Sequence, residues 1–194
     1  MRTAATFSGL LLSATLAVAS LSHAAAQLIA GTFDPPRPAP DFELQHSNGG
    51  SLRLSDHRGK VILLGFGFTS CPDVCPTTLA TLAQAHRQLG DQAGQLQVIY
   101  ITVDPQTDTT AQMKKYLATF NPTFIGGTGA ETQLSAIRKE YGILAQKKSV
   151  GTKYTYSHSS YVYLIDRGGQ LRALMPYGHK AEDFAHDVRA LLAE

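Results

Sequence analysis

The sequence predicts an α/β fold, with a central mixed β-sheet flanked by helices. A continuous apolar run, residues 61–68, and a second, largely apolar stretch, residues 96–103, are typical of strands that are buried on both faces. Helical apolar spacing follows each run, and the chain ends in two short strands and an amphipathic helix. The element order βαβα followed by ββα describes a mixed sheet with helices on both faces.

Composition fits one globular domain. The chain has 194 residues, of which 43% are hydrophobic and 16% are charged, enough for a full-sized core. The formal net charge of +2 is too small to favour nucleic acid or an anionic membrane surface as a partner. We therefore expect no nucleic-acid partner.

The N-terminus, residues 1–26, is predicted to be a signal peptide or an N-terminal membrane anchor. Arg2 precedes a short apolar core over 10–21, and small residues at 24–26 offer a cleavage site. This core is shorter than the roughly 20 residues that span a bilayer. No charge lies between Thr3 and Phe33, so an uncleaved membrane anchor remains an alternative to a cleaved signal peptide. Export predicts an oxidising location, in the periplasm or at the outer face of the inner membrane.

Residues 27–40 are predicted to be a proline-rich linker. Four prolines between Gly31 and Pro40 favour a stiff, extended spacer. The folded domain is then expected over residues 41–194.

The first half of this domain contains a hairpin and a βαβ unit. Residues 42–44 and 51–54 flank Asn48-Gly49-Gly50, which is typical of a β-hairpin. The strand 61–68 is followed by a helix with apolar residues at helical spacing from Leu79 to Leu89, and then by the strand 96–103.

The second half adds helices and a further hairpin. Helices are predicted over 109–120, where Thr109 or Thr110 is the expected cap, and over 131–141. Strands 160–165 and 170–175 flank a glycine-rich turn, and a C-terminal helix carries an apolar stripe that includes Phe184. This is the thioredoxin order with an extra N-terminal β-hairpin and an inserted helix.

Both cysteines of the chain, Cys71 and Cys75, directly follow the buried strand 61–68. Two thiols this close form a local disulfide or a two-sulfur metal site. Pro76 cannot lie deep inside a helix, so the helix is expected to begin near Cys75 with Pro76 as its first residue. A helix N-terminus favours thiolates, and both thiols are expected to have a lowered pKa. A purely structural disulfide is the weaker interpretation, because so short a loop constrains little of the unfolded chain.

His158 is the candidate third ligand. Six histidines lie beyond the signal, and five of them are interpreted as solvated, packed or unassigned residues. His158 precedes a predicted strand, and in the thioredoxin arrangement the loop entering that strand lies beside the cysteine-bearing helix. Two thiolates and one imidazole suit Cu(I), and also Cu(II) with one more ligand, whereas zinc would want a fourth ligand. The predicted cofactor is therefore copper.

An ordinary thioredoxin-type reductase is disfavoured. Such an enzyme has two residues between its cysteines and a cis-proline in the loop that faces them. This chain has three residues between Cys71 and Cys75, and no proline between Pro122 and Pro176. His158 occupies that region instead.

Four stretches, residues 68–79, 103–109, 120–129 and 157–166, closely resemble the Sco/SenC family of copper-binding assembly proteins. The likeness runs from about Pro40 to the C-terminus. It implies a thioredoxin-like fold, with copper bound by Cys71, Cys75 and His158. It also implies delivery of copper to the binuclear copper site of cytochrome c oxidase, or reduction of the thiols of that site. One departure is Ser157, where family members often have aspartate before the histidine.

The predicted function is that of an exported copper metallochaperone for assembly of that oxidase site. The alternative is a thiol–disulfide oxidoreductase, in which the redox-active pair Cys71 and Cys75 keeps the copper-site cysteines of a partner reduced. Expected partners are the copper-site subunit of cytochrome c oxidase and other copper chaperones or thiol reductants. The chain is expected to be a monomer.

Overall fold

The computed structural model describes residues 27–194, and the segment predicted to be a signal or anchor, 1–26, lies outside the described residues. The larger sheet contains β1 (Gly31–Pro38), β2 (Glu43–His46), β3 (Ser51–Arg53), β4 (Val61–Gly67), β5 (Leu96–Thr102), β6 (Ile125–Thr128), β9 (Tyr161–Ile165) and β10 (Gln170–Pro176). A separate hairpin pairs β7 (Ala145–Val150) with β8 (Lys153–His158). The helices are α1 (Val74–Gln88), α2 (Thr110–Ala118), α3 (Glu131–Glu140) and α4 (Ala181–Leu192), with 3-10 turns at Leu54–His57 and Gly90–Gln95.

The larger sheet is mixed, and its strand order is β1-β10-β9-β4-β5-β6-β2-β3. β4 and β5 lie at its centre, are parallel to each other and are buried along their whole length. β9 runs antiparallel to β4, while β6 continues the parallel part on the other side. The prediction of two strands buried on both faces is confirmed.

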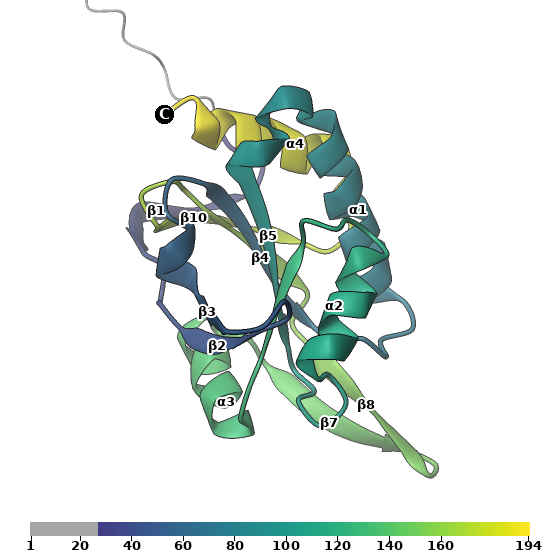
Figure 1. The fold of residues 1–194 in the computed structure, drawn as a ribbon. Helices are drawn as coiled ribbons and strands as arrows, with labels where there is room; N and C mark the ends of the chain where they lie inside the picture. The colour runs from purple at the N-terminus through teal and green to yellow at the C-terminus, as the bar shows by residue number, and fades with distance from the viewer. Residues whose placement is uncertain (1–26) are drawn as a thin grey trace, which may run out of the picture.

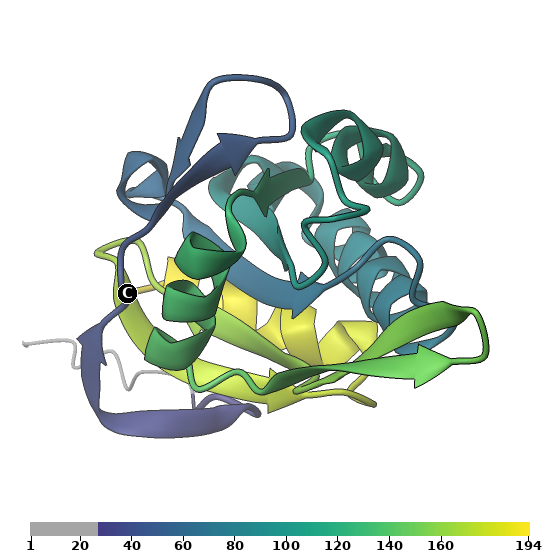
Figure 2. The ribbon, with the colours of Figure 1, turned by 90° about the horizontal axis from the view of Figure 1, so that it is seen from below.

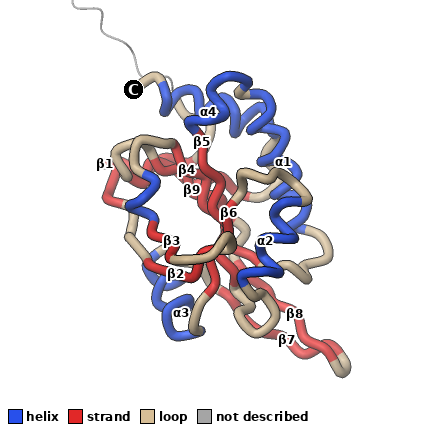
Figure 3. Tube along the Cα trace, viewed as in Figure 1, coloured by secondary structure: helices blue, strands red, loops and turns tan. Residues whose placement is uncertain are grey.

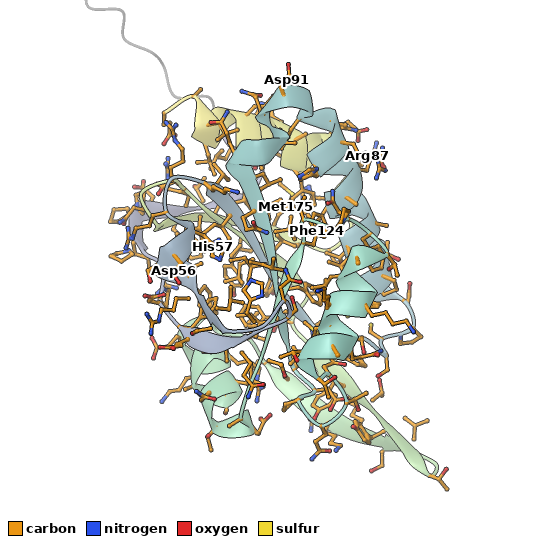
Figure 4. The ribbon with its side chains drawn as sticks, viewed as in Figure 1. Asp56, His57, Arg87, Asp91, Phe124 and Met175 are labelled. Atoms are coloured by element: carbon orange, nitrogen blue, oxygen red, sulfur yellow. The ribbon has the colours of Figure 1, made fainter. Side chains whose placement is uncertain are left out.

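Helices cover both faces of the sheet (Figures 1 and 3). α1 packs along α4, α2 packs on β6, and α3 lies on the opposite side of the sheet. Figure 4 shows the side chains that fill these layers; Phe124 and Met175 belong to the buried core, while Asp91 lies on the surface. No helix within residues 27–194 has the length and apolarity needed to cross a membrane.

The predicted linker over 27–40 is corrected, because it includes a strand of the sheet. β1 pairs antiparallel with β10 at the sheet edge, with an irregularity between Thr32 and Arg37. Prolines fit there, because an edge strand leaves one row of backbone groups without a partner strand. Just before β1, the backbone N–H groups of Ile29 and Ala30 both donate to the buried carboxylate of Asp187 in α4, at 2.8 Å each. The folded unit therefore starts well before residue 41.

The other predicted elements are present, with small shifts at their ends. The hairpin of β2 and β3 and the hairpin of β9 and β10 are both confirmed. Thr109 caps α2, since its hydroxyl accepts a hydrogen bond from the Gln112 backbone N–H at 3.2 Å. α1 begins at Val74, so Pro76 is its third residue and not its first. A proline is tolerated there because the first N–H groups of a helix have no partner within it.

Candidate functional site

The two cysteines lie where β4 passes into α1. Cys71 is half-buried in the connecting loop, and Cys75, the second residue of α1, is 1% exposed. The Cys75 backbone N–H points at the Cys71 sulfur, with an N–Sγ distance of 3.4 Å. The Cys71 sulfur therefore lies at the free N–H groups of a helix start, as was expected from Pro76 for both sulfurs.

His158 faces this pair from the far part of the chain. Its Nε2 atom lies 3.5 Å from the Cys75 sulfur, although the two residues are 83 positions apart. The proximity predicted from the strand order is confirmed, but His158 is the last residue of β8 and not part of a loop. Its ring also packs edge-on against Phe68, with 5.9 Å between centroids.

The backbone selects the tautomer of His158. Its Nδ1 atom lies 2.8 Å from the Ser159 carbonyl oxygen, which can only accept, so Nδ1 carries the proton. In the neutral ring Nε2 then has a free lone pair directed at Cys75. A histidine held in this way is ready to accept a proton from the thiol or to bind a metal ion.

The two thiols differ in charge state. The pKa of Cys71 is lowered to about 4, mainly because the Cys75 thiol donates to it, with help from the backbone N–H groups of Asp73 and Cys75. The pKa of Cys75 is raised, because it donates to the Cys71 thiolate and because it is buried. The expectation that both thiols have a lowered pKa is therefore correct for Cys71 and wrong for Cys75.

A buried carboxylate fixes the loop that carries Cys71. Asp108 has no exposed surface and accepts hydrogen bonds from the backbone N–H and the hydroxyl of Thr69, at 3.0 and 2.6 Å. It also accepts one from the Thr102 hydroxyl at the end of β5, at 2.6 Å. Asp108 therefore ties the residue two positions before Cys71 to the centre of the sheet.

A second carboxylate holds the hairpin that carries His158. The Tyr154 hydroxyl in β8 lies 3.2 Å from both carboxylate oxygens of Asp104, a residue that is 1% exposed. The same hydroxyl is 2.9 Å from the Thr107 hydroxyl. Because Asp104 and Asp108 belong to one turn after β5, this turn positions both halves of the site.

The donor set fits a soft metal ion. Two sulfurs and one imidazole nitrogen are the ligands that copper prefers. Within residues 27–194 no three His, Cys, Asp or Glu side chains are already spaced as around a metal ion. The three donors are instead joined through hydrogen bonds, so a bound ion would replace the shared protons.

Residues 30–193 match the family model described as SCO1/SenC. The chain belongs to the SCO1/SenC family. Among related proteins, it is 36% identical to the mitochondrial SCO2 homologue of Bos taurus over 157 residues, which are 79% of this chain and 59% of that protein. It is 36% identical to an SCO2-like protein of Rickettsia felis over 133 residues, 67% of this chain and 65% of that protein. The matched part thus spans less than two thirds of either relative.

Solved structures of SCO1/SenC proteins confirm the thioredoxin-like fold. ScoI of Bradyrhizobium japonicum, solved with copper bound, is 33% identical with a TM-score of 0.74, over 79% of this chain and 99% of that one. Yeast Sco1 with copper bound is 28% identical with a TM-score of 0.73, over 82% and 90% of the two chains. The mixed sheet and its flanking helices are therefore those of the family.

Sequence reasoning missed the residues that support the SCO1/SenC site. Asp104, Asp108 and Thr69 are ordinary polar residues in a loop, where a turn or cap is the default interpretation. Their burial was the missing information, and only the folded chain supplies it. The Asp104-Pro105 turn after a largely apolar strand was the one available signal.

Proposed function

We propose that this chain is an exported copper metallochaperone that serves the binuclear copper site of cytochrome c oxidase. Copper is bound by the sulfurs of Cys71 and Cys75 and by Nε2 of His158. The observation that carries the proposal is the 3.5 Å contact between the Cys75 sulfur and the His158 ring, beside a second cysteine at the same helix start.

Access to the site supports transfer of the metal and not permanent storage. Cys71 is half-buried, while Cys75 is fully buried. A partner's thiol can therefore reach a metal ion from the Cys71 side first. Three protein donors leave an open position, which suits an ion that must be passed on.

Related proteins support the choice of metal and partner. The proteins of Bradyrhizobium japonicum and yeast named above were solved with copper bound. BsSco, which is 22% identical with a TM-score of 0.66, is described as a member of the Sco family of cytochrome c oxidase assembly proteins. By family membership we assign this chain the same class of partner: the copper-site subunit of the oxidase, with other copper chaperones or thiol reductants upstream.

The proposed location is the periplasm or the outer face of the inner membrane. Residues 1–26 act as a signal peptide or as an anchor, and the domain works as a monomer. In an oxidising compartment the pair of thiols would tend to close unless it is metallated or reduced.

A second function, reduction of a partner's disulfide, is favoured by one observation. The lowered pKa of Cys71 makes it a thiolate at neutral pH, and a half-buried thiolate is the form that attacks disulfides. In this alternative, Cys71 attacks the partner and Cys75 then resolves the mixed disulfide.

Copper binding by the His158→Ala variant tests the main proposal. We expect its Cu(I) affinity to fall more than about 100-fold, since even indirect partners of metal ligands are worth 10–100-fold. The matched control is His179→Ala, which removes an imidazole bonded to Asp183 outside the site. Unchanged affinity and an unchanged Cu(II) spectrum in His158→Ala would contradict the three-ligand site.

Turnover on a disulfide substrate separates the two functions. Failure of the wild-type protein to bind copper, together with rapid thiol–disulfide exchange, would support the reductase instead.

A further inference from the structure

A tyrosine of the neighbouring strand lies across two glycines of β4. Tyr100 pairs in register with Gly65, and a Cβ atom added to Gly65 would be 3.0 Å from two ring carbons of Tyr100. A Cβ atom added to Gly67 would be 1.9 Å from the Tyr100 hydroxyl oxygen. The Tyr100 ring therefore extends along β4 towards the C-terminal end of that strand. It occupies space that the side chain of any other residue at position 65 or 67 would fill.

The Tyr100 hydroxyl lies close to the sulfur of Cys75. The same added Cβ atom at Gly67 would be 2.8 Å from that sulfur, so oxygen and sulfur are at most 4.7 Å apart, the sum of the two distances. That separation allows the hydroxyl to donate to the sulfur, and this interaction opposes the rise in the pKa of the Cys75 thiol. Tyr100 is 2% exposed, so bulk water does not compete for its hydroxyl. A buried tyrosine hydroxyl normally has a partner, and the Cys75 sulfur lies beside this one.

We propose that Tyr100 is a positioning residue that sets the redox balance of the Cys71–Cys75 pair by donating a hydrogen bond to the Cys75 sulfur. A thiol, thiolate or copper-bound sulfur accepts this bond better than a disulfide sulfur, because it carries more electron density. The hydroxyl therefore stabilises the reduced and the metallated pair relative to the disulfide. For the metallated form the inference rests on the proposed function, whereas for the thiols it stands alone.

The thiol equilibrium with glutathione tests the inference without metal. In that reaction the two thiols of the pair and one glutathione disulfide give the protein disulfide and two molecules of glutathione. Removing the hydroxyl in Tyr100→Phe should favour the protein disulfide about tenfold, the size expected for one buried hydrogen bond. That change corresponds to a midpoint potential about 30 mV more negative.

Tyr116→Phe is the matched control. In the described part of the chain, the Tyr116 hydroxyl is buried without a hydrogen-bond partner, although it lies near the same pair. Its removal should leave the glutathione equilibrium within twofold of the wild type. Thermal unfolding of both variants shows whether a difference in packing is involved, because phenylalanine keeps the ring in place.

The Cu(II)-loaded protein gives an independent readout. A hydrogen bond lowers the energy of the sulfur lone pairs, so Tyr100→Phe should move the sulfur-to-Cu(II) charge-transfer band to longer wavelength, and Tyr116→Phe should not. A glutathione equilibrium for Tyr100→Phe within twofold of the wild type, or an equal shift in Tyr116→Phe, would overturn the inference. If the wild type binds no copper, the proposed function fails, while the glutathione equilibrium still decides the role of Tyr100.

Discussion

The Asp108→Ala variant should unfold more easily and should bind copper less well. Asp108 accepts three hydrogen bonds in a place with no solvent, two of them from Thr69 and one from Thr102. Thr69 lies two residues before Cys71. Truncation of the carboxylate therefore affects stability and the position of a proposed ligand together.

The expected loss in the free energy of unfolding is about 3 kcal/mol. Each hydrogen bond to a charged acceptor contributes about 1.5–3 kcal/mol, so three would exceed this value. Burial also raises the pKa of Asp108, which means that the ionised carboxylate is held at a cost that alanine removes. Asp108→Asn keeps one acceptor oxygen and loses the buried charge, so it should cost less than half as much as Asp108→Ala.

Urea unfolding followed by circular dichroism measures both variants, and an unchanged m-value shows that the midpoints can be compared. Asp73→Ala is the control, because Asp73 is an exposed acid within the cysteine loop and makes no side-chain cap. It should change stability by less than about 0.5 kcal/mol. A loss below about 1 kcal/mol in Asp108→Ala, or equal losses in the alanine and asparagine variants, would refute the reasoning.

Three further outcomes are expected. In the metal-free reduced protein, iodoacetamide should spare Cys75 and should modify Cys71 at a rate that stays nearly constant from pH 6 to 9, because the pKa of Cys71 is about 4. Mass spectrometry after quenching measures the modification of both cysteines. A Cys71 rate that rises with pH up to 8.5 would contradict the lowered pKa. Asp187→Ala should lower the free energy of unfolding by about 2 kcal/mol and speed hydrogen exchange of the two amides that precede β1. Asp91→Ala, which removes an exposed acid, is the control and should leave both nearly unchanged. Amides that stay protected in Asp187→Ala would argue against that attachment. Burial lowers the pKa of His57, so the unfolded state binds more protons, and the stability that is present above the pKa of the unfolded state is lost as pH falls through the pKa of the folded state. The wild type should therefore lose more stability than His57→Gln between pH 7 and 5 in urea titrations. Equal losses in the two proteins would contradict this direction of the pH dependence.

The sequence predicted the elements whose side chains show a clear pattern. β4 is a continuous apolar run, β5 is apolar apart from Gln97 and Thr102, and α4 carries an apolar stripe, so burial could be inferred directly. β6 contains two glycines in four residues and therefore shows no alternation. β7 and β8 pair only with each other and bury little, so no apolar signal marks them. β1 was hidden by its prolines, which an edge strand accepts.

The site was predictable where it depended on topology and unpredictable where it depended on depth. Strand order alone brought His158 to the cysteine pair. The opposite charge states of Cys71 and Cys75 follow from a difference in burial, which spacing does not reveal. Tyr100 read as one more apolar residue of its strand, although Gly65 and Gly67 in the facing strand marked the space that its ring occupies.

The attachment of the segment before β1 also determines how the domain is oriented. Ile29 and Ala30 are fixed to α4, while the cysteine loop and the hairpin of β7 and β8 lie towards the other end of the molecule (Figures 1 and 2). An anchor that ends at residue 29 would hold the domain at the end opposite the cysteine loop. In that case the three proposed copper ligands would face away from the membrane, at a distance set by the length of the folded domain.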